Sequence, residues 1–377
     1  MVWTDLAAVA AGAWFALLLV PWQPWRTRER LEADVASLAR VALGDVTVLM
    51  PARNEASVIA RSLAGLASQG AALKVILIDD GSTDGTADIA RRAGLADLTV
   101  IEAPALAAGW TGKLWALEQG RQMVTTPYVL LLDADIALSP GLVATLLEKA
   151  QGEHLALVSL MAAPAMSGFW DRWWMPVFIY FFKLLYPFHL ANRPAAGTAA
   201  AAGGCLLVTR EALEGAGGFG ALRGAVIDDC TLAALVKRQG RGATWTGLTH
   251  SAVMLRATDL RGFWRMVART AFTQLRYSYT LLAACAVIMG VVFVAPFAAI
   301  LAGGEAARAT GLAAWVLMGL SYAPTARFYR QSPLAVAALP VAGVAFLLMT
   351  FTSALWYARG VRSRWKGRDY SRESGRG

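Results

Sequence analysis

The stretch YVLLLDAD at residues 128–135 places a run of strand-forming residues directly before two aspartates. Two earlier stretches have the same form, KVILIDD at 74–80 and VTVLMPARNE at 46–55. Continuous apolar strands are typical of parallel sheets that helices cover on both faces. Ligands of such sheets bind beyond the carboxyl ends of the strands. The three stretches therefore predict a parallel sheet with its ligand-binding groups along one edge.

The region around these stretches, from Val41 to Leu160, alternates short β-rich runs with helical runs. The expected strands are 46–50, 74–78, 98–101, 128–132 and 155–160, followed later by 206–209. The expected helices are 56–68, 86–93, 112–123 and 141–151. This alternation predicts an α/β fold with a doubly wound, mostly parallel sheet.

The composition is 57% hydrophobic and only 16% charged over 377 residues. Soluble domains are about 25% charged, so an ordinary cytosolic enzyme is not expected. The formal net charge is +9, but many basic residues flank apolar stretches. That placement favours contact with anionic lipid headgroups over nucleic acid. We therefore expect a protein attached to the lipid bilayer, with no nucleic-acid partner.

Three uncharged runs are long enough to cross a bilayer, at residues 6–25, 277–304 and 331–358. Arginines at 26, 28 and 30 follow the first run and predict that its carboxyl end is cytoplasmic. A cleaved signal peptide is the alternative, although basic residues follow this run rather than precede it. A shorter run, 309–326, carries Pro324 and is left open between a spanning, a re-entrant and an interfacial segment.

The expected organisation is a multi-pass protein of a bacterial-type inner (cytoplasmic) membrane, with its α/β domain in the cytoplasm. Its first parts are an N-terminal transmembrane helix (1–25) and a basic linker (26–44). The α/β domain (45–276), two or three C-terminal spans (277–358) and a basic tail (359–377) follow. The tail favours the cytoplasm, whereas three C-terminal crossings would end it outside, so the number of spans stays open. The aromatic segment 169–190 is interpreted as interfacial, with buried core as the alternative.

The strand that ends at Asp79 and Asp80 runs into a glycine turn. Carboxylates in such a turn can receive the base and the ribose hydroxyls of a nucleotide. For Asp80, at the strand edge, ligand binding is favoured. For Asp84, a cap of the following helix is favoured.

Asp133 and Asp135 follow the next buried strand at close spacing, so they would repel each other unless a cation or donors held them. Mg²⁺ prefers one or two carboxylates together with substrate phosphate oxygens. Lys113, in the run GWTGK before a helix, suits a diphosphate. A solvated lysine in an ordinary loop is the alternative.

The motifs VLMPARNE, IDDGSTDGT, GWTGK and LLDAD, in this order, resemble those of the inverting glycosyltransferases of family 2, which have the GT-A fold. The broad resemblance covers residues 45–280. The GWTGK element and the stretch RTAFTQLRY at 269–277 are more narrowly similar to the hopanoid-associated membrane glycosyltransferases. The resemblance implies an enzyme of the hexosyltransferase type.

The resemblance also implies roles for matching residues. Those it assigns to the nucleotide-sugar pocket are Pro51, Arg53, Glu55, Asp79, Asp80, Lys113 and Asp133. Asp80 would receive the base, and Asp79 would support it. Asp135 would hold a divalent metal, Mg²⁺ or Mn²⁺, with Asp133 at the ribose or the metal. Lys113 would lie near the diphosphate.

The family also expects an acidic pair whose second member is the general base, and IDDC at 227–230 occupies that place. Asp229 is therefore the candidate catalytic residue, because an inverting transfer needs a carboxylate to deprotonate the acceptor hydroxyl. A cap of the helix at 231–238 is the alternative, and both roles are compatible. Residues assigned more loosely to the acceptor or the diphosphate are Gly204, Cys205, Asp228, Gln274 and Arg276. For the glycines, close packing is an equal alternative.

The run QLRY at 274–277 departs from the Q-x-x-R-W pattern of processive family members, so polymer synthesis is not expected. Arginines at 261, 265 and 269 recur at helical spacing and favour lipid headgroups. For Arg276, which follows these arginines, contact with the diphosphate of the donor is the more specific alternative to lipid binding.

The leading hypothesis is transfer of a single sugar from a nucleoside diphosphate sugar, with a UDP-sugar favoured, to a hydroxyl of a membrane lipid such as a hopanoid or related polyprenoid. Transfer to polyprenyl phosphate and a non-catalytic sugar-nucleotide-binding subunit are the alternatives. The first alternative needs no strong base, and the second needs none at all.

Overall fold

The computed structural model describes residues 2–70, 72–240, 242–365 and 368–371. The chain divides into two compact units, which are considered separately. The sheet unit is formed by residues 29–165, 188–257 and the described residues from 365 onward, and the helical unit by residues 2–28, 166–187 and 258–364. Residues 166–187 and 258–276 thus group with the apolar helices and not with the α/β domain in which the sequence analysis placed them.

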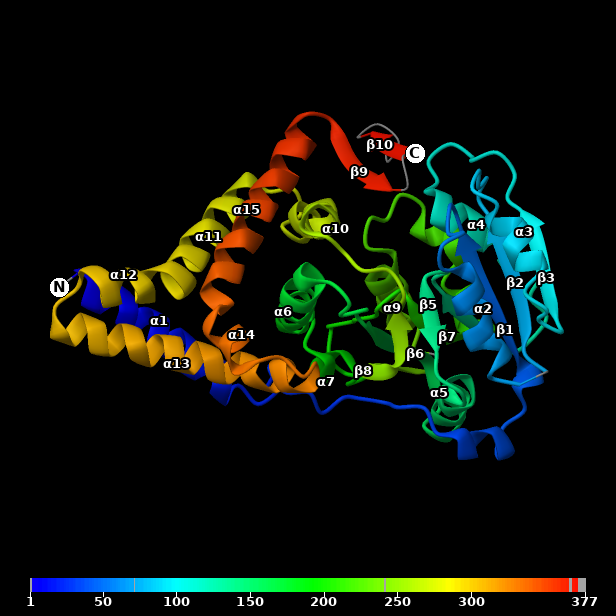
Figure 1. Cartoon of the computed structure of the whole chain (residues 1–377), viewed down its shortest axis with the longest axis horizontal. Coiled ribbons are helices and arrows are strands. Elements are labelled where there is room, and N and C mark those ends of the chain that lie inside the picture. Colours follow the sequence, from blue (N-terminus) through cyan, green and yellow to red (C-terminus); the bar gives the residue numbers. More distant parts are fainter. Residues whose placement is uncertain (1, 71, 241, 366–367, 372–377) are drawn as a thin grey trace. The chain divides into compact units, whose positions relative to one another are not determined.

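Within the described residues, eight strands of the sheet unit form one sheet in the order β3-β2-β1-β4-β7-β6-β8-β5 (Figure 1). These strands are β1 (Val46–Ala52), β2 (Lys74–Asp79), β3 (Leu98–Glu102), β4 (Tyr128–Leu132), β5 (Ile136–Leu138), β6 (Leu155–Ala163), β7 (Cys205–Thr209) and β8 (Ala243–Met254). β7 is antiparallel to β4 and β6, and β5 is antiparallel to β8. The other pairings are parallel, so the predicted mostly parallel sheet is confirmed.

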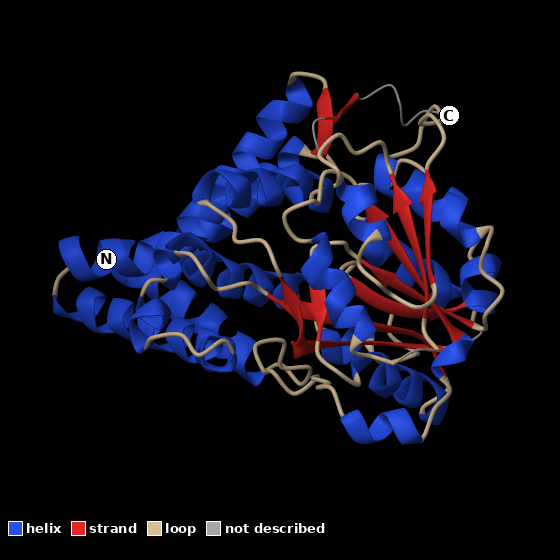
Figure 2. Cartoon of the chain, turned by 45° about the vertical axis from the view of Figure 1, so that its right-hand side comes forward, coloured by secondary structure: helices blue, strands red, loops and turns tan. Residues whose placement is uncertain are grey.

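Helices cover both faces of this sheet, which Figure 2 shows with strands in red and helices in blue. The helices are α2 (Ile59–Ala67), α3 (Thr86–Arg91), α4 (Gly112–Arg121), α5 (Leu142–Gly152), α7 (Phe188–Ala191), α8 (Arg210–Gly215) and α9 (Asp228–Arg238). Val48 and Met50 of β1 pack with α2 and α5, whereas Leu49 packs with α4 and α9. Successive strand side chains point to opposite faces, so one continuous apolar strand supplies both layers of core.

The expected helix at 56–68 begins later, at Ile59. The reason is local: Glu55 donates its backbone N–H to Thr86 Oγ1 at 2.8 Å, and Ala56 donates to Asp84 Oδ2 at 3.0 Å. These bonds hold the chain after β1 in a turn, and they join the loops that follow β1 and β2. The strand and helix boundaries that carry the motifs otherwise lie within a few residues of those predicted.

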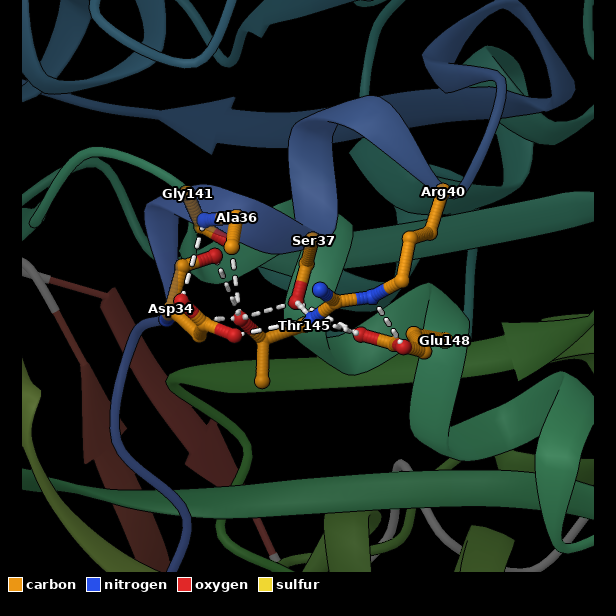
Figure 3. Close-up of polar contacts among 7 residues, drawn as sticks. All are labelled: Asp34, Ala36, Ser37, Arg40, Gly141, Thr145 and Glu148. Atoms are coloured by element: carbon orange, nitrogen blue, oxygen red, sulfur yellow. Dashed lines mark hydrogen bonds and ion pairs between the residues drawn. The ribbon is translucent and has the colours of Figure 1, made fainter.

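The linker before β1 is fastened to α5 in the sheet unit (Figure 3). The backbone N–H of Asp34 donates to Thr145 Oγ1 at 2.9 Å, and Ser37 Oγ donates to Glu148 Oε2 at 2.6 Å. Arg40 Nε lies 2.5 Å from Glu148 Oε1. A short 3₁₀ turn, η1 (Val35–Ala39), carries this contact. Residues 29–41 therefore form a strap across the domain and are not a free spacer.

The helical unit contains α1 (Val2–Leu19), α6 (Phe169–Leu185), α10 (Leu260–Gln274), α11 (Tyr279–Met289), α12 (Ala295–Ala302), α13 (Glu305–Phe328), α14 (Pro333–Ala337) and α15 (Leu339–Ala358). Three helical stretches among the described residues are long and apolar enough to cross a membrane: Val2–Leu19, Tyr279–Ala302 and Leu339–Ala358. The first ends at Leu19 and not at Trp25, since Pro21 disfavours a helical conformation at the residue before it. A π-helical turn, Gly290–Val294, joins α11 to α12.

The segment left open around Pro324 is a helix of 24 residues, α13, which packs beside α1 (Figure 1). It is not among the three apolar candidates of the described chain. The aromatic helix α6 continues through Pro176, and Tyr180 shares a buried 2.6 Å hydrogen bond with Ser321 of α13. Its first residue, Phe169, has 65% of its surface exposed. Its last residue, Leu185, is 61% exposed. The middle of α6 is therefore buried core, and its two ends have the exposure expected of an interfacial segment.

In the described part of the chain, β9 (Val361–Trp365) and β10 (Arg368–Ser371) form a separate two-stranded sheet. The expected basic tail, 359–377, lies partly outside the described residues.

Candidate functional site

The predicted polar groups lie beyond the carboxyl ends of β1, β2 and β4, which are neighbours in the sheet. Ala52 of β1 is level with Asp79 of β2, and Leu49 is level with Leu131 of β4. Because the three strands are parallel, the residues that follow them meet at one edge. The structure thus brings the first, second and fourth motifs together as the sequence analysis expects.

The corner between β1 and β2 pairs Arg53 with Asp80. Arg53 Nη1 lies 3.6 Å from Asp80 Oδ2, and it also donates a hydrogen bond to the Asp80 backbone carbonyl. The Asp80 side chain is only 4% exposed, so its carboxylate is held by a cation rather than by water. Asp79 accepts hydrogen bonds from the backbone and the hydroxyl of Ser82, which fixes the turn. Asp79 therefore supports the turn that presents Asp80.

Asp84 has the structural role that was favoured for it. Its Oδ1 accepts from the backbone N–H of Thr86, the first residue of α3, at 3.1 Å. Its Oδ2 accepts from Ala56 in the neighbouring loop. The N-cap position itself belongs to Gly85, whose φ of 85° suits glycine. Asp84 thus joins two loops and secures the start of α3.

Lys113 lies in the first turn of α4 and faces the aspartates that follow β4. Its Nζ is 2.7 Å from Asp133 Oδ1, and its side chain is 22% exposed. Burial alone would lower the pKa of Lys113, but the negative charges of Asp133 and Asp228 raise it above its usual value. Lys113 therefore stays cationic in the neutral range. This paired, mostly buried lysine does not fit the alternative of a solvated loop residue.

Asp229 lies in the first turn of α9 and accepts two backbone hydrogen bonds. Its Oδ2 accepts from Gly203 N at 2.8 Å, and its Oδ1 accepts from Cys230 N at 2.7 Å. Burial, and next the negative charge of Asp228, raise the pKa of Asp229 to about 6, against an ordinary 3.8. Asp229 is thus ionised at neutral pH yet basic enough to accept a proton.

Glycines allow a close backbone approach beside Asp229. A Cβ on Gly203 would lie 3.2 Å from Asp229 Cβ and 3.3 Å from Asp229 Oδ2. A Cβ on Gly204 would lie 2.4 Å from Ile136 Cδ1. The two glycines before β7 therefore allow the backbone to approach the acidic residues closely. Close packing accounts for them, and their contact with an acceptor stays a prediction.

A pocket connects these groups. Its charged lining consists of Lys113, Asp133, Asp228 and Asp229, and its apolar lining includes Pro51, Leu114, Leu206 and Phe219. The pocket thus brings residues of β1, α4, β4 and α9 around one space. A carboxylate with a raised pKa, a cation and further carboxylates face this space, which is the set of groups that a group-transfer site requires.

The residues assigned loosely to the acceptor or the diphosphate lie in different parts of the structure. Cys205 is fully buried in the core of the sheet unit, where burial raises the pKa of its thiol to about 12. Its side chain therefore offers no surface to an acceptor, which corrects that expectation. Gln274 and Arg276 belong to the helical unit, where Gln274 Oε1 accepts from the Tyr186 hydroxyl at 2.8 Å. Asp228 lines the pocket.

Asp133 and Asp135 are the residues that would hold a divalent metal. Both are partly exposed beyond the end of β4. No group of three or more histidine, cysteine, aspartate or glutamate side chains in the described part of the chain could hold a metal by itself. Two carboxylates nevertheless fit Mg²⁺ or Mn²⁺ when the substrate phosphates supply further oxygens. The donor set of this edge therefore fits a metal that binds together with the nucleotide.

One residue at this edge was missed by the sequence analysis. Arg256, just after β8, donates a hydrogen bond from Nη2 to Glu55 Oε2. No motif surrounds Arg256 in the sequence, and 201 positions separate it from Glu55. Only the pairing of β8 within the sheet brings the two together.

The fold of the sheet unit is GT-A-like, which agrees with a solved structure that aligns over nearly the whole chain. This structure is the mannosyltransferase PcManGT from Pyrobaculum calidifontis in complex with GDP-Man and Mn²⁺. The TM-score is 0.55 at 19% sequence identity, covering 94% of this chain and 99% of that chain. The likeness concerns the fold.

Residues 47–216 match the model of the family described as glycosyl transferase family 2. The chain is 34% identical over 125 residues to the 4,4'-diaponeurosporenoate glycosyltransferase of Staphylococcus aureus (strain USA300), which is 33% of this chain and 32% of that protein. The protein of the same name from strain bovine RF122 / ET3-1 is 35% identical over 126 residues. The chain thus spans about a third of the length of these relatives. The similarity to this family is therefore confined to residues 47–216, which are less than half of the chain.

Proposed function

We propose that this chain is a membrane-anchored inverting glycosyltransferase that transfers one sugar from a nucleoside diphosphate sugar to a lipid hydroxyl. The observation that carries the proposal is Asp229, a carboxylate with a pKa of about 6 in the pocket that also contains Lys113 and Asp133. A UDP-sugar is the favoured donor, and a hopanoid or related polyprenoid is the favoured acceptor class.

The donor would lie along the edge formed by the loops after β1, β2 and β4. Asp80, fixed by Arg53, would receive the base. Pro51, which lines the observed pocket, and Glu55 would lie beside the nucleotide. Lys113 would contact the diphosphate, because a cation in a largely buried position interacts strongly with phosphate oxygens. The contact between Lys113 and Asp133 would then be shared with the donor.

Asp133 and Asp135 would hold Mg²⁺ or Mn²⁺. Such an ion, when bound, neutralises the negative charge that develops on the leaving diphosphate. The structural neighbour from Pyrobaculum calidifontis was solved with Mn²⁺, which supports a divalent ion for this fold. Lys113, whose pKa is raised, adds a fixed positive charge at the same edge.

Asp229 would act as the general base. Its Oδ atoms accept hydrogen bonds from Gly203 and Cys230, which hold the carboxylate in one orientation. The acceptor hydroxyl would give its proton to this carboxylate as its oxygen attacks the sugar from the face opposite the diphosphate. A base with a pKa close to the working pH combines a large ionised fraction with a useful proton affinity.

A lipid acceptor is supported by the apolar helices and by the relatives. Three helical stretches of the described chain could cross a membrane, which would keep the domain next to lipid substrates. The relatives are named for 4,4'-diaponeurosporenoate, a lipid-like acid. That name favours one second candidate, transfer to an acidic lipid, since an ionised acceptor such as a carboxylate or a polyprenyl phosphate needs no base.

The test is release of nucleoside diphosphate by the purified full chain. The assay would use a panel of UDP- and GDP-sugars with Mn²⁺ or Mg²⁺, with and without total bacterial lipid, followed by mass spectrometry of the lipid. We expect release that depends on one donor, on lipid and on Asp229. Release that survives Asp229→Asn would favour the acidic acceptor. Donor binding without release under any lipid would contradict the proposal.

A further inference from the structure

The end of β8 carries a cation that none of the motifs includes. Arg256 Nη2 donates to Glu55 Oε2, and the side chain of Arg256 is 45% exposed, whereas that of Glu55 is only 7% exposed. A buried carboxylate without a partner is unfavourable, so Glu55 holds Arg256 in place. Two loops that are far apart in the sequence are thereby joined across the edge of the site.

Arg256 is also adjacent to the turn that contains Asp135. The backbone N–H of Leu255 donates to the carbonyl of Asp135 at 2.7 Å. Beyond that bond, β5 and β8 pair in antiparallel fashion, with Ile136 level with Met254. The turn after β4 is thus bound to Leu255, which directly follows β8, and the next residue along the chain, Arg256, is the one that binds Glu55. Arg256 is therefore one residue away along the chain from the residue that is hydrogen-bonded to Asp135.

Glu55 is suited to be the fixed end of this connection. Its backbone N–H donates to Thr86 Oγ1 at 2.8 Å. Its carbonyl accepts from Val58 and Ile59, both at 2.9 Å, at the start of α2. α2 is itself joined to β5, because Ser62 Oγ donates to the carbonyl of Ile136 at 2.6 Å within the core. Glu55 therefore has little freedom, and the ion pair with Arg256 transfers that rigidity to the end of β8.

We infer that Glu55 and Arg256 form a latch that positions Asp135 for the divalent metal. The inference rests on the proposed function, since it assigns a role toward the metal that this function implies. Arg256 is a positioning residue here: it acts through the Leu255–Asp135 hydrogen bond and through the charge it shares with Glu55. Residues that orient metal ligands without binding the metal typically alter metal affinity about 10–100-fold when they are changed.

The experiment measures Mn²⁺ binding to the purified full chain by electron paramagnetic resonance, with and without UDP or GDP. The variants are Arg256→Gln, Glu55→Gln, the double variant and Arg256→Lys. Arg91→Gln is the matched control, because Arg91 pairs with Asp88 and Glu102 next to β3, away from this edge. Thermal unfolding of each variant separates loss of the latch from loss of the fold.

We expect Arg256→Gln and Glu55→Gln each to weaken Mn²⁺ binding about tenfold or more. The double variant should be no weaker than either single variant, because both changes remove the same interaction. Arg256→Lys should restore part of the affinity, and Arg91→Gln should equal the unmodified chain. An ion pair with only a structural role would change the melting temperature and leave Mn²⁺ binding as it was.

Three results would overturn the latch, and they are distinguishable. If the unmodified chain binds Mn²⁺ and the folded Arg256→Gln and Glu55→Gln variants bind it equally well, the latch is wrong and the proposed function stands. If the unmodified chain binds no Mn²⁺ even with nucleotide, the metal assignment of the proposed function fails together with the latch. Additive losses in the double variant would also exclude a shared interaction.

Discussion

The raised pKa of Asp229 predicts a specific pH dependence of turnover. The acceptor proton can move to Asp229 only when its carboxylate is ionised, so the rate must fall as the pH falls through its pKa of about 6. The ionised fraction is about nine-tenths at about pH 7 and about one-tenth at about pH 5. We therefore expect kcat/KM to drop roughly tenfold between these two values. An aspartate with the ordinary pKa of 3.8 would lose less than about a tenth over the same interval.

The assay is initial release of nucleoside diphosphate at low donor concentration, in buffers of constant ionic strength. Lys113 does not contribute to the drop, because its raised pKa keeps it cationic throughout. The control is Asp228→Asn, which removes the like charge that helps to raise the pKa of Asp229. The inflection should then move to lower pH. A profile that stays flat down to about pH 5, or an inflection that Asp228→Asn leaves in place, would refute the reasoning.

Three further predictions concern metal binding, the strap and the approach of the backbone to the base. Asp135→Asn should abolish metal-dependent nucleotide binding, measured by calorimetry, while leaving the melting temperature unchanged; equal affinity at saturating Mn²⁺ would contradict the metal assignment. Gly141→Ala should lower the melting temperature further than Gly85→Ala, because overpacking lowers the free energy of unfolding by about 1–3 kcal/mol. Both glycines have φ of 85°, but only at Gly141 would a Cβ meet the strap, 2.8 Å from Asp34 O, so equal shifts would exclude the strap contact. Gly203→Ala should reduce kcat about tenfold with donor affinity retained, since Asp229 must shift by a few tenths of an ångström; unchanged kcat would show that this orientation is not needed.

Much of the fold could be predicted because local signals and tertiary structure agree. β4 occupies 128–132 as predicted. The five residues between Pro127 and Asp133 form a continuous apolar run, which is typical of a buried parallel strand. The edge of the site follows from the same rule, because parallel strands that end in polar residues place those residues together. Lys113 and Asp133, which lie on different elements, meet at 2.7 Å for this reason.

Other features depend on interactions that a linear sequence does not display. β5 has only three residues and exists because it pairs with β8, and the same pairing brings Arg256 to the site. The aromatic pattern of α6 and the amphipathic pattern of α10 suit either a domain core or a helical bundle. The structure assigns both helices to the helical unit. Cys205 follows two glycines at the site but points into the core, since side chains alternate along β7.

The most direct test of the central claim compares donor binding with turnover in Asp229→Asn. The asparagine keeps the size of the side chain and an oxygen that can accept the hydrogen bond from Gly203, but it cannot take a proton. If Asp229 is the general base for a hydroxyl acceptor, nucleotide-sugar affinity should be retained, while turnover with lipid should fall about 100-fold or more. Turnover close to that of the unmodified chain would contradict the account.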